Sequence, residues 1–177
     1  MVGLFAVVAL VSTAALAGAL APPDQEQFTS RMNERVRREL VTLPYYGVFD
    51  NLGFEVSGSV VTLYGQVTRP STHQDAGRRV SRIPGVSRVV NRIEVLPLST
   101  FDNAIRVRTY RAVFRTGSLY RYALGANPSI HIIVNTGRVT LEGVVSNETD
   151  RRLAYVAASG VPGVFSVTNN LRVGSRG

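Results

Sequence analysis

The sequence contains no cysteine and no lysine, and only two histidines among its 177 residues. The missing cysteines exclude disulfide bonds, thiolate metal sites, cysteine nucleophiles and a lipid-anchored N-terminal cysteine. Because His73 and His131 are the only imidazoles, a histidine-rich metal centre is excluded as well. We therefore expect neither a metal ion nor a cofactor.

Acidic residues are also few. Twelve Asp and Glu stand against 20 basic residues, all of them arginine, and the formal net charge is +8. Arginine is permanently charged and makes bidentate contacts with phosphate and carboxylate groups, so the excess indicates an anionic partner, such as phospholipid, nucleic acid or an acidic glycan. The alternative is a codon bias toward arginine combined with a solvated surface. The acids lack the paired spacing used in carboxylate catalysis, and we do not expect an enzyme.

Residues 1–21 carry no charged side chain. An apolar core at 4–11 is followed by Ala15-Leu16-Ala17 and Ala19-Leu20-Ala21, which both fit the small-x-small pattern of signal cleavage. No basic residue precedes the core, and 20 apolar residues can also span a bilayer. We interpret 1–21 as a signal peptide or a membrane anchor, with a buried helix as a third alternative. Either of the first two makes the protein periplasmic or otherwise exported, and makes nucleic acid a poor partner.

The rest of the chain contains an internal repeat. Three segments recur in register at an offset of 78 residues, without a gap between them. The pairs are 61–65 with 139–143, 84–86 with 162–164, and 91–95 with 169–173. Three matches at one offset indicate a duplicated unit.

Each unit shows the pattern αββαβ, which predicts an α+β fold with a three-stranded sheet backed by two helices. We place the units at 28–96 and 101–173. The first helix of unit 1 has one apolar face and ends before Pro44. The positions of that face are Phe28, Met32, Val36, Leu40 and Leu43. Two alternating strands follow, with a turn at 57–59, and a second helix is expected from a Thr68 cap to about Ile83, with Gly85 as its C-terminal stop.

Unit 2 repeats this order. Ser99 or Thr100 is expected to cap a helix over 101–116, and the turn at 135–137 joins two strands. Ser146 stands where Thr68 stands, so both second helices are predicted to begin with a hydroxyl cap. One unit of about 70 residues is marginal alone, and the connection at 96–100 is short and contains proline. We therefore expect the two units to pack in a fixed orientation.

This pattern resembles the BON domain of bacterial periplasmic proteins. The resemblance rests on alternating apolar residues, a Gly-x-Val-x-Leu-x-Gly segment, a Gly-Val turn and a last strand with Asn-x-Leu/Ile-x-Val. In unit 2 these are 132–134, 137–143, 163–164 and 169–173, and in unit 1 they are 54–56, 60–65, 85–86 and 91–95. Tandem units behind an export segment are similar to osmotically inducible periplasmic proteins and to dual-BON lipoproteins, although the lipid-bearing cysteine of the latter is missing.

The resemblance implies a non-catalytic module that binds anionic phospholipid surfaces and supports envelope integrity or stress tolerance. The alternative is a periplasmic module that interacts with or scaffolds other envelope proteins, without direct lipid contact.

The candidate lipid-binding residues come from two patterns. The first helix of unit 2 contains Arg106, and it carries an arginine stripe at Arg108, Arg111 and Arg115, with Arg121 just beyond. The equivalent helix of unit 1 interleaves arginine with glutamate, so unit 2 is the favoured unit. Tyrosines follow the first helix of each unit, and their apolar rings with polar tips suit an interface. They are Tyr45, Tyr46, Tyr120 and Tyr122. The alternatives are a solvated helix face for the arginines and a contact between units for the tyrosines.

We predict that the mature protein begins at Gly18, because Pro22 directly after Ala21 makes the second cleavage site the less favourable one. Cell fractionation followed by N-terminal sequencing measures both export and cleavage. A Met1 N-terminus in the membrane fraction would show an anchor, and a full-length protein in the cytosol would contradict export.

Overall fold

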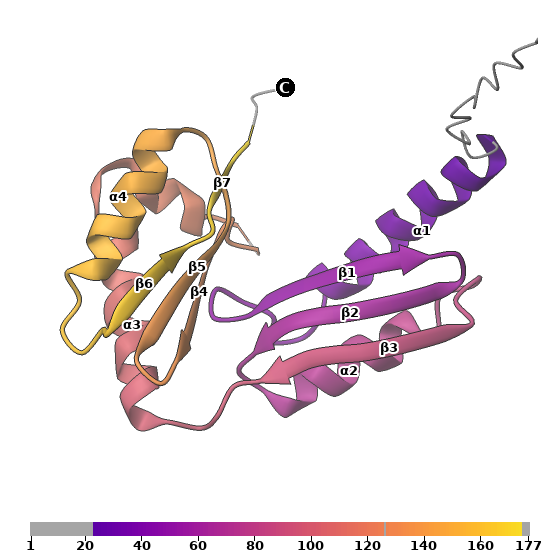
Figure 1. Cartoon of the computed structure of the whole chain (residues 1–177), viewed down its shortest axis with the longest axis horizontal. Coiled ribbons are helices and arrows are strands. Elements are labelled where there is room, and N and C mark those ends of the chain that lie inside the picture. The colour runs from indigo at the N-terminus through magenta and orange to yellow at the C-terminus, as the bar shows by residue number, and fades with distance from the viewer. Residues whose placement is uncertain (1–22, 126, 175–177) are drawn as a thin grey trace, which may run out of the picture.

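The computed structural model describes residues 23–125 and 127–174. The predicted export segment, 1–21, lies outside the described residues. Unit 1 consists of α1 (Pro23–Val41), β1 (Asn51–Ser57), β2 (Val60–Val67), α2 (Pro70–Val80) and β3 (Arg88–Val95). Unit 2 consists of α3 (Thr100–Phe114), the 3-10 helix η1 (Gly117–Ala123), β4 (Ile130–Asn135), β5 (Arg138–Val145), α4 (Glu148–Ser159), β6 (Ser166–Asn169) and β7 (Arg172–Val173). The predicted α+β fold with two αββαβ units is confirmed (Figure 1).

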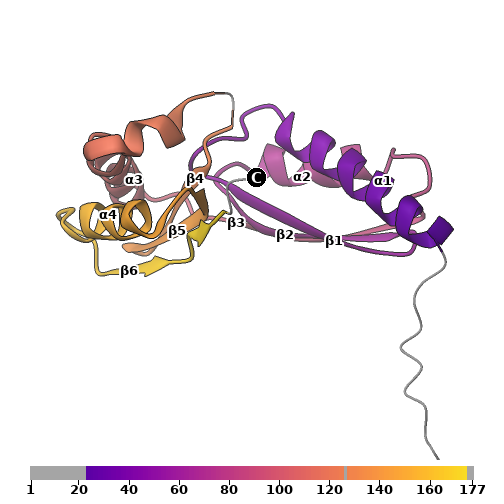
Figure 2. The same ribbon diagram turned by 90° about the horizontal axis from the view of Figure 1, so that it is seen from above.

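Each unit has two layers, with both helices on one face of the sheet (Figure 2). In unit 1 the predicted apolar face of α1 packs on the sheet, and Met32, Val36 and Leu40 are buried. Phe28, at the start of that face, remains 45% exposed. Burying one such aliphatic side chain stabilises the fold by about 1.5–3 kcal/mol, so this face holds the helix on the sheet.

The two sheets have the same topology. The first two strands of each unit form an antiparallel hairpin, and the last strand returns parallel to the middle one after the second helix. In unit 2 the predicted last strand is divided into β6 and β7, so the sheet has four strands rather than three, and β5 pairs with the other three. Both pieces keep one register, because Arg138 pairs with Ser166 and Val144 with Arg172.

The asparagine that opens each Asn-x-Leu/Ile-x-Val segment ties the last strand to the second helix. Asn91 donates to the carbonyl of His73 at 2.9 Å, and Asn169 donates to the carbonyl of Arg151 at 2.9 Å. The side-chain oxygen of each asparagine also accepts from the backbone two residues further on. The backbone N–H of Ile93 in unit 1 and of Leu171 in unit 2 thereby has a hydrogen-bond acceptor.

A glycine is required at the end of the motif because the neighbouring strand leaves no room. Gly65 and Gly143 have φ of +113° and +119°, a region that side chains strongly disfavour. A Cβ on Gly65 would lie 2.1 Å from the carbonyl oxygen of Asn51, and a Cβ on Gly143 would meet Ser129 at the same distance.

The predicted hydroxyl caps of the second helices are wrong. The hydroxyl of Thr68 donates to Asp50 at 2.9 Å instead, and Asp50 also accepts from the Thr68 backbone. Arg69 occupies the cap position without a side-chain hydrogen bond. In unit 2 the cap is Asn147, whose side chain accepts from the backbone of Asp150 at 2.8 Å. The buried carboxylate of Asp50 holds both the hydroxyl and the backbone N–H of Thr68, so this hydroxyl does not accept from the free N–H groups at the start of α2.

Two helix ends also differ from expectation. The second helix of unit 1 ends at Val80 rather than near Ile83, and Ile83 is buried in the turn that follows. The first helix of unit 2 begins after Ser99, one of the two expected caps, but it ends at Phe114 rather than at Thr116. The chain then forms η1, an element that the periodicity did not predict.

The two units are packed together, as expected, and the contact is made by the loop 42–50 after α1. The carbonyl of Val48 accepts from the backbone of Ile132 at 2.7 Å, on the free edge of β4. Val48 and Phe49 also pack against the core of unit 2. An unpaired strand edge is a site of unwanted association, and this loop covers part of it.

His131 lies in the same contact, on the face of β4 opposite to the core. Its ring packs against Tyr46 at 5.6 Å between centroids, and Nδ1 lies 3.3 Å from the carbonyl oxygen of Gly47. Burial lowers the pKa of His131, although its contact with Gly47 and the nearby Asp50 and Glu142 favour the charged form. Burial also raises the pKa of Tyr46 to about 12, so that phenol stays neutral.

We predict that the free energy of unfolding falls as the pH is lowered below about 6.5, the ordinary pKa of histidine. The unfolded chain then binds a proton at His131 that the folded chain does not, so the loss is at most about 1.4 kcal/mol per pH unit. Denaturant titrations between pH 5 and 7.5 measure it. A His131→Gln variant is expected to flatten this dependence, and an unchanged slope would contradict the assignment.

Candidate functional site

An open groove lies where the units meet, and we call it the inter-unit groove. It has a volume of about 710 Å³. Its lining comes from the loop 42–50, α3 and η1, namely Val48, Phe49, Val107, Tyr110, Arg111, Phe114, Arg115, Tyr120 and Ala123. Ligand sites of this size often lie between domains and combine an apolar lining with a few polar groups.

The floor of the inter-unit groove is a row of aromatic rings. Phe49 from unit 1 meets the edge of Tyr110 at 6.2 Å between centroids, and Tyr110 lies 4.9 Å from Phe114. Around this row the surface is apolar and open, because Val107 is 42% exposed and Tyr120 is 60% exposed. Such exposed apolar side chains, grouped in one groove, indicate a contact surface rather than a packed core.

The structure divides the predicted arginine stripe. Arg111 and Arg115 line the inter-unit groove, but Arg108 is directed to the turn after α4 and donates to the carbonyl of Pro162 at 3.2 Å. All three side chains are exposed. Arg106, in the same basic stretch, is buried and donates to the carbonyl of Val134 at 2.7 Å, so it belongs to the core.

Two of the predicted lipid-binding residues, Arg121 and Tyr122, belong to a network around Asp150. Tyr122 is buried, its hydroxyl donates to Asp150, and it accepts from the backbone of Ser146 at 2.9 Å. Arg121 forms an ion pair with the same carboxylate. Burial alone would raise the pKa of Asp150, but hydrogen bonds from Tyr122 and Ser118 and the charge of Arg121 lower it below the ordinary value.

This network anchors η1 to the start of α4. A membrane could reach Tyr122 only if the network opened, so Tyr122 is corrected from a lipid-binding to a structural residue. Tyr46 is likewise held against His131 in the contact between units. Tyr45 and Tyr120 remain exposed, at 69% and 60%. Arg69 lies over the ring of Tyr45 at 4.6 Å.

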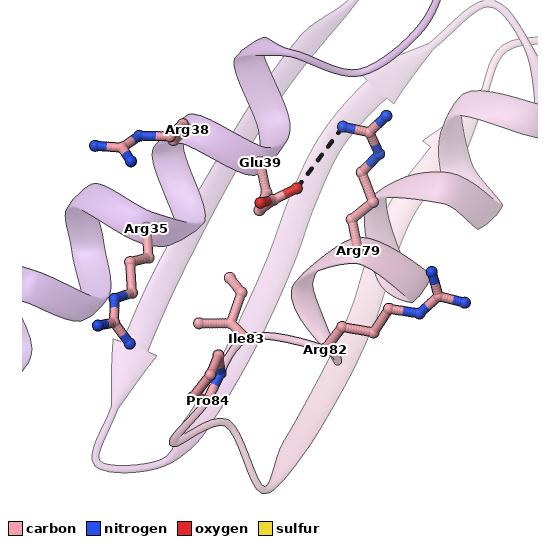
Figure 3. A pocket seen from close by; sticks show the side chains of 7 residues that line it. All are labelled: Arg35, Arg38, Glu39, Arg79, Arg82, Ile83 and Pro84. Carbon is pink, nitrogen blue, oxygen red and sulfur yellow. Dashed lines mark ion pairs between the residues drawn. The ribbon is translucent and has the colours of Figure 1, made fainter.

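A second basic region was missed by the sequence analysis. A groove of about 530 Å³ between α1 and α2 of unit 1 collects four arginines, and we call it the arginine groove. It is lined by Arg35, Arg38, Glu39, Arg79, Arg82, Ile83 and Pro84. Figure 3 shows Arg35 and Arg38 on one side and Arg79 and Arg82 on the other. The sequence places these pairs some 40 residues apart, and only the packing of the two helices brings them together.

The first helices of the two units are related by a smaller shift than the rest. Phe28 lies beside Gly85 in unit 1, and Phe101 lies beside Gly163 in unit 2. Since Gly85 and Gly163 correspond, Phe28 corresponds to Phe101, a shift of 73 residues (28 to 101) against 78 (85 to 163). With this shift α1 and α3 end at equivalent positions. The five extra residues of unit 2 lie between α3 and β4, where η1 forms.

Within the residues that the structure describes, no group of three His, Asp or Glu side chains is arranged to hold a metal ion. Among 23–125 and 127–174, none of the helices combines the length and hydropathy needed to cross a bilayer.

Comparison with known proteins follows the internal duplication. The profile of the BON domain matches residues 30–97 and 120–175, which together make up more than half of the chain. The chain belongs to the BON family. Each match spans one αββαβ unit apart from its first helix in unit 2, where the second BON match begins inside η1. A search of curated proteins finds no match.

Two solved structures of CdsD, a structural protein of the type III secretion system of Chlamydia trachomatis, are similar to this BON protein. The first, a C-terminal domain, has 10% identity and a TM-score of 0.34, and the match covers 79% of this chain and 96% of that one. The second has 9% identity and a TM-score of 0.34, with coverage of 82% and 93%.

We predict that Tyr122→Phe destabilises the protein by about 1–3 kcal/mol, because it leaves the half-buried backbone N–H of Ser146 without its acceptor and removes a donor from the buried Asp150. Tyr120→Phe, at an exposed ring, is the matched control and is expected to change stability by less than about 0.5 kcal/mol. Denaturant unfolding of both variants measures the difference. Equal stability of the two variants would show that the Asp150 network does not hold η1.

Proposed function

We propose that this BON protein is an exported, non-catalytic envelope protein that binds anionic phospholipid surfaces through the inter-unit groove. The observation that carries the proposal is that exposed rings and arginines lie side by side in one open groove. Arg111 and Arg115 stand at the aromatic row formed by Phe49 and Tyr110. A role in envelope integrity or stress tolerance is consistent with such an activity.

The two kinds of side chain supply different parts of the binding energy. Each arginine near an anionic leaflet contributes about 1 kcal/mol, so Arg111 and Arg115 alone would give weak attachment. Apolar insertion adds the remainder, and Val107, Tyr120 and Leu124 are sufficiently exposed to supply it, with Leu124 at 66%. An uncleaved N-terminal segment would strengthen the attachment by raising the local concentration.

The BON family membership supports an envelope location, since the family occurs in periplasmic proteins. Export itself depends on residues 1–21 and is tested by the N-terminal sequencing described above. We infer that the alternative function, docking of envelope proteins, uses a different surface, and we return to it below.

We predict that the protein sediments with vesicles containing phosphatidylglycerol at low salt, and that added salt weakens this binding because exposed charges are screened. Arg111→Glu combined with Arg115→Glu is expected to weaken it by about thirtyfold or more, from about 1 kcal/mol per arginine removed. The control is Arg138→Glu combined with Arg172→Glu, which makes the same change of charge on the exposed sheet of unit 2. Equal losses in both pairs, or no sedimentation with the unaltered protein, would remove the proposal.

A further inference from the structure

The arginine groove of unit 1 holds positive charge that the described part of the chain does not neutralise. Arg35, Arg38 and Arg82 form no ion pair with any described residue. Arg79 has one acidic partner, Glu39, at 3.7 Å, and both side chains of that pair are about one-third exposed, at 35% and 38%. Four arginines and one glutamate leave the groove with a net charge of +3.

The fold does not require this charge, as unit 2 shows. The equivalents there are Arg108 for Arg35, Arg111 for Arg38, Ala112 for Glu39, Ala157 for Arg79 and Gly160 for Arg82. Unit 2 therefore packs the same pair of helices with two arginines fewer and small residues on α4. Like charges brought together lower stability, so their accumulation in unit 1 alone points to a ligand.

The spacing of the arginines fits an extended ligand rather than a single compact anion. Arg31, Arg35 and Arg38 recur on one side of α1 and span about 10 Å along its axis. On the opposite side, Arg79 lies in the last turn of α2 and Arg82 lies just after its end. In Figure 3 the four guanidinium groups are not directed at one point, since that of Arg79 faces Glu39 and those of Arg38 and Arg82 extend away from the space between the helices. One phosphate group would reach only a part of them.

The groove also offers apolar surface along its length. Pro84 lies at the floor between the two helices. Beside Pro84 the arginine groove continues into a smaller groove of about 230 Å³, which is lined by Phe28 and Arg31. Phe28 is the one residue of the α1 apolar face, among those that the structure describes, that is nearly half exposed. A ligand that lies along both grooves contacts arginine side chains and apolar side chains in alternation.

We propose that the arginine groove binds an extended acidic peptide segment of a partner protein, in which carboxylates alternate with apolar side chains. The planar guanidinium pairs with carboxylate through two parallel hydrogen bonds, so each arginine can hold one Asp or Glu of the peptide. Apolar side chains of the peptide pack on Pro84 and Phe28. Glu39 occupies part of this site and competes with the peptide for Arg79. This surface is separate from the inter-unit groove, which belongs to α3, η1 and the loop 42–50.

The test measures fluorescence anisotropy of a labelled decapeptide of alternating Glu and Leu, with an analogue that carries Gln in place of Glu. We expect the purified protein to bind the Glu peptide at least about tenfold more tightly than the Gln analogue, with weaker binding at high salt. Arg35→Gln combined with Arg79→Gln is expected to weaken binding by about tenfold. Arg138→Gln combined with Arg172→Gln, outside the groove, is the matched control and is expected to stay within about twofold.

Glu39→Gln separates a binding role from a structural one. Loss of the competing carboxylate is expected to tighten peptide binding by about threefold, which a merely damaged fold would not do. Equal weakening by both double variants, no gain with Glu39→Gln, or displacement of the peptide by pyrophosphate at lower concentration than by unlabelled peptide would each overturn the proposal. Arg111→Glu with Arg115→Glu reports on vesicle binding, so failure of one proposal is distinguished from failure of the other.

Discussion

The joining of the two units, and with it the inter-unit groove, depends on the contact between the loop 42–50 and β4. The carbonyl of Val48 pairs with an edge strand of unit 2, while Tyr46 covers His131 and Phe49 enters the aromatic row of α3. Each unit, whose stability alone would be marginal, thereby packs against the other unit. The two sheets, which have separate cores, are joined by this contact. Without this contact the inter-unit groove would lose one of its walls.

The two BON units use one scaffold for different surfaces. Unit 2 has five more residues than unit 1 between equivalent positions of its first helix and its first strand, in the segment that contains η1, and the Asp150 network holds η1 against α4. That insertion brings Tyr120 beside α3 and makes the surface aromatic. Unit 1 lacks the insertion, and arginines from both of its helical segments line one groove instead. A duplicated fold can diverge in this way because surface positions contribute little to stability, whereas core positions and turn glycines are constrained by packing.

Local patterns predicted the elements well because their causes are local. Apolar spacing along α1, the turn glycines and the Ser99 cap each depend on residues close in the sequence. At Ser146 the predicted cap failed because the adjacent Asn147 caps α4, whereas at Thr68 it failed because a distant group, Asp50, accepts from the hydroxyl. For the same reason Tyr122 was mistaken for a surface residue. The exposure of a side chain depends on which distant residues cover it, and its neighbours in the sequence do not identify those residues.

The duplication, the αββαβ order, the excess of arginine and the exclusion of cysteine chemistry were all readable before folding. These follow from periodicity and composition, which need no knowledge of distant contacts. Which arginines share a surface became known from the packing of the helices. It separated Arg108 from Arg111 and Arg115, buried Arg106, and joined Arg35 and Arg38 to Arg79 and Arg82. The interaction energy between charges depends on their distance in space. The arginines of helices far apart in the chain come close together only when those helices pack on a common sheet.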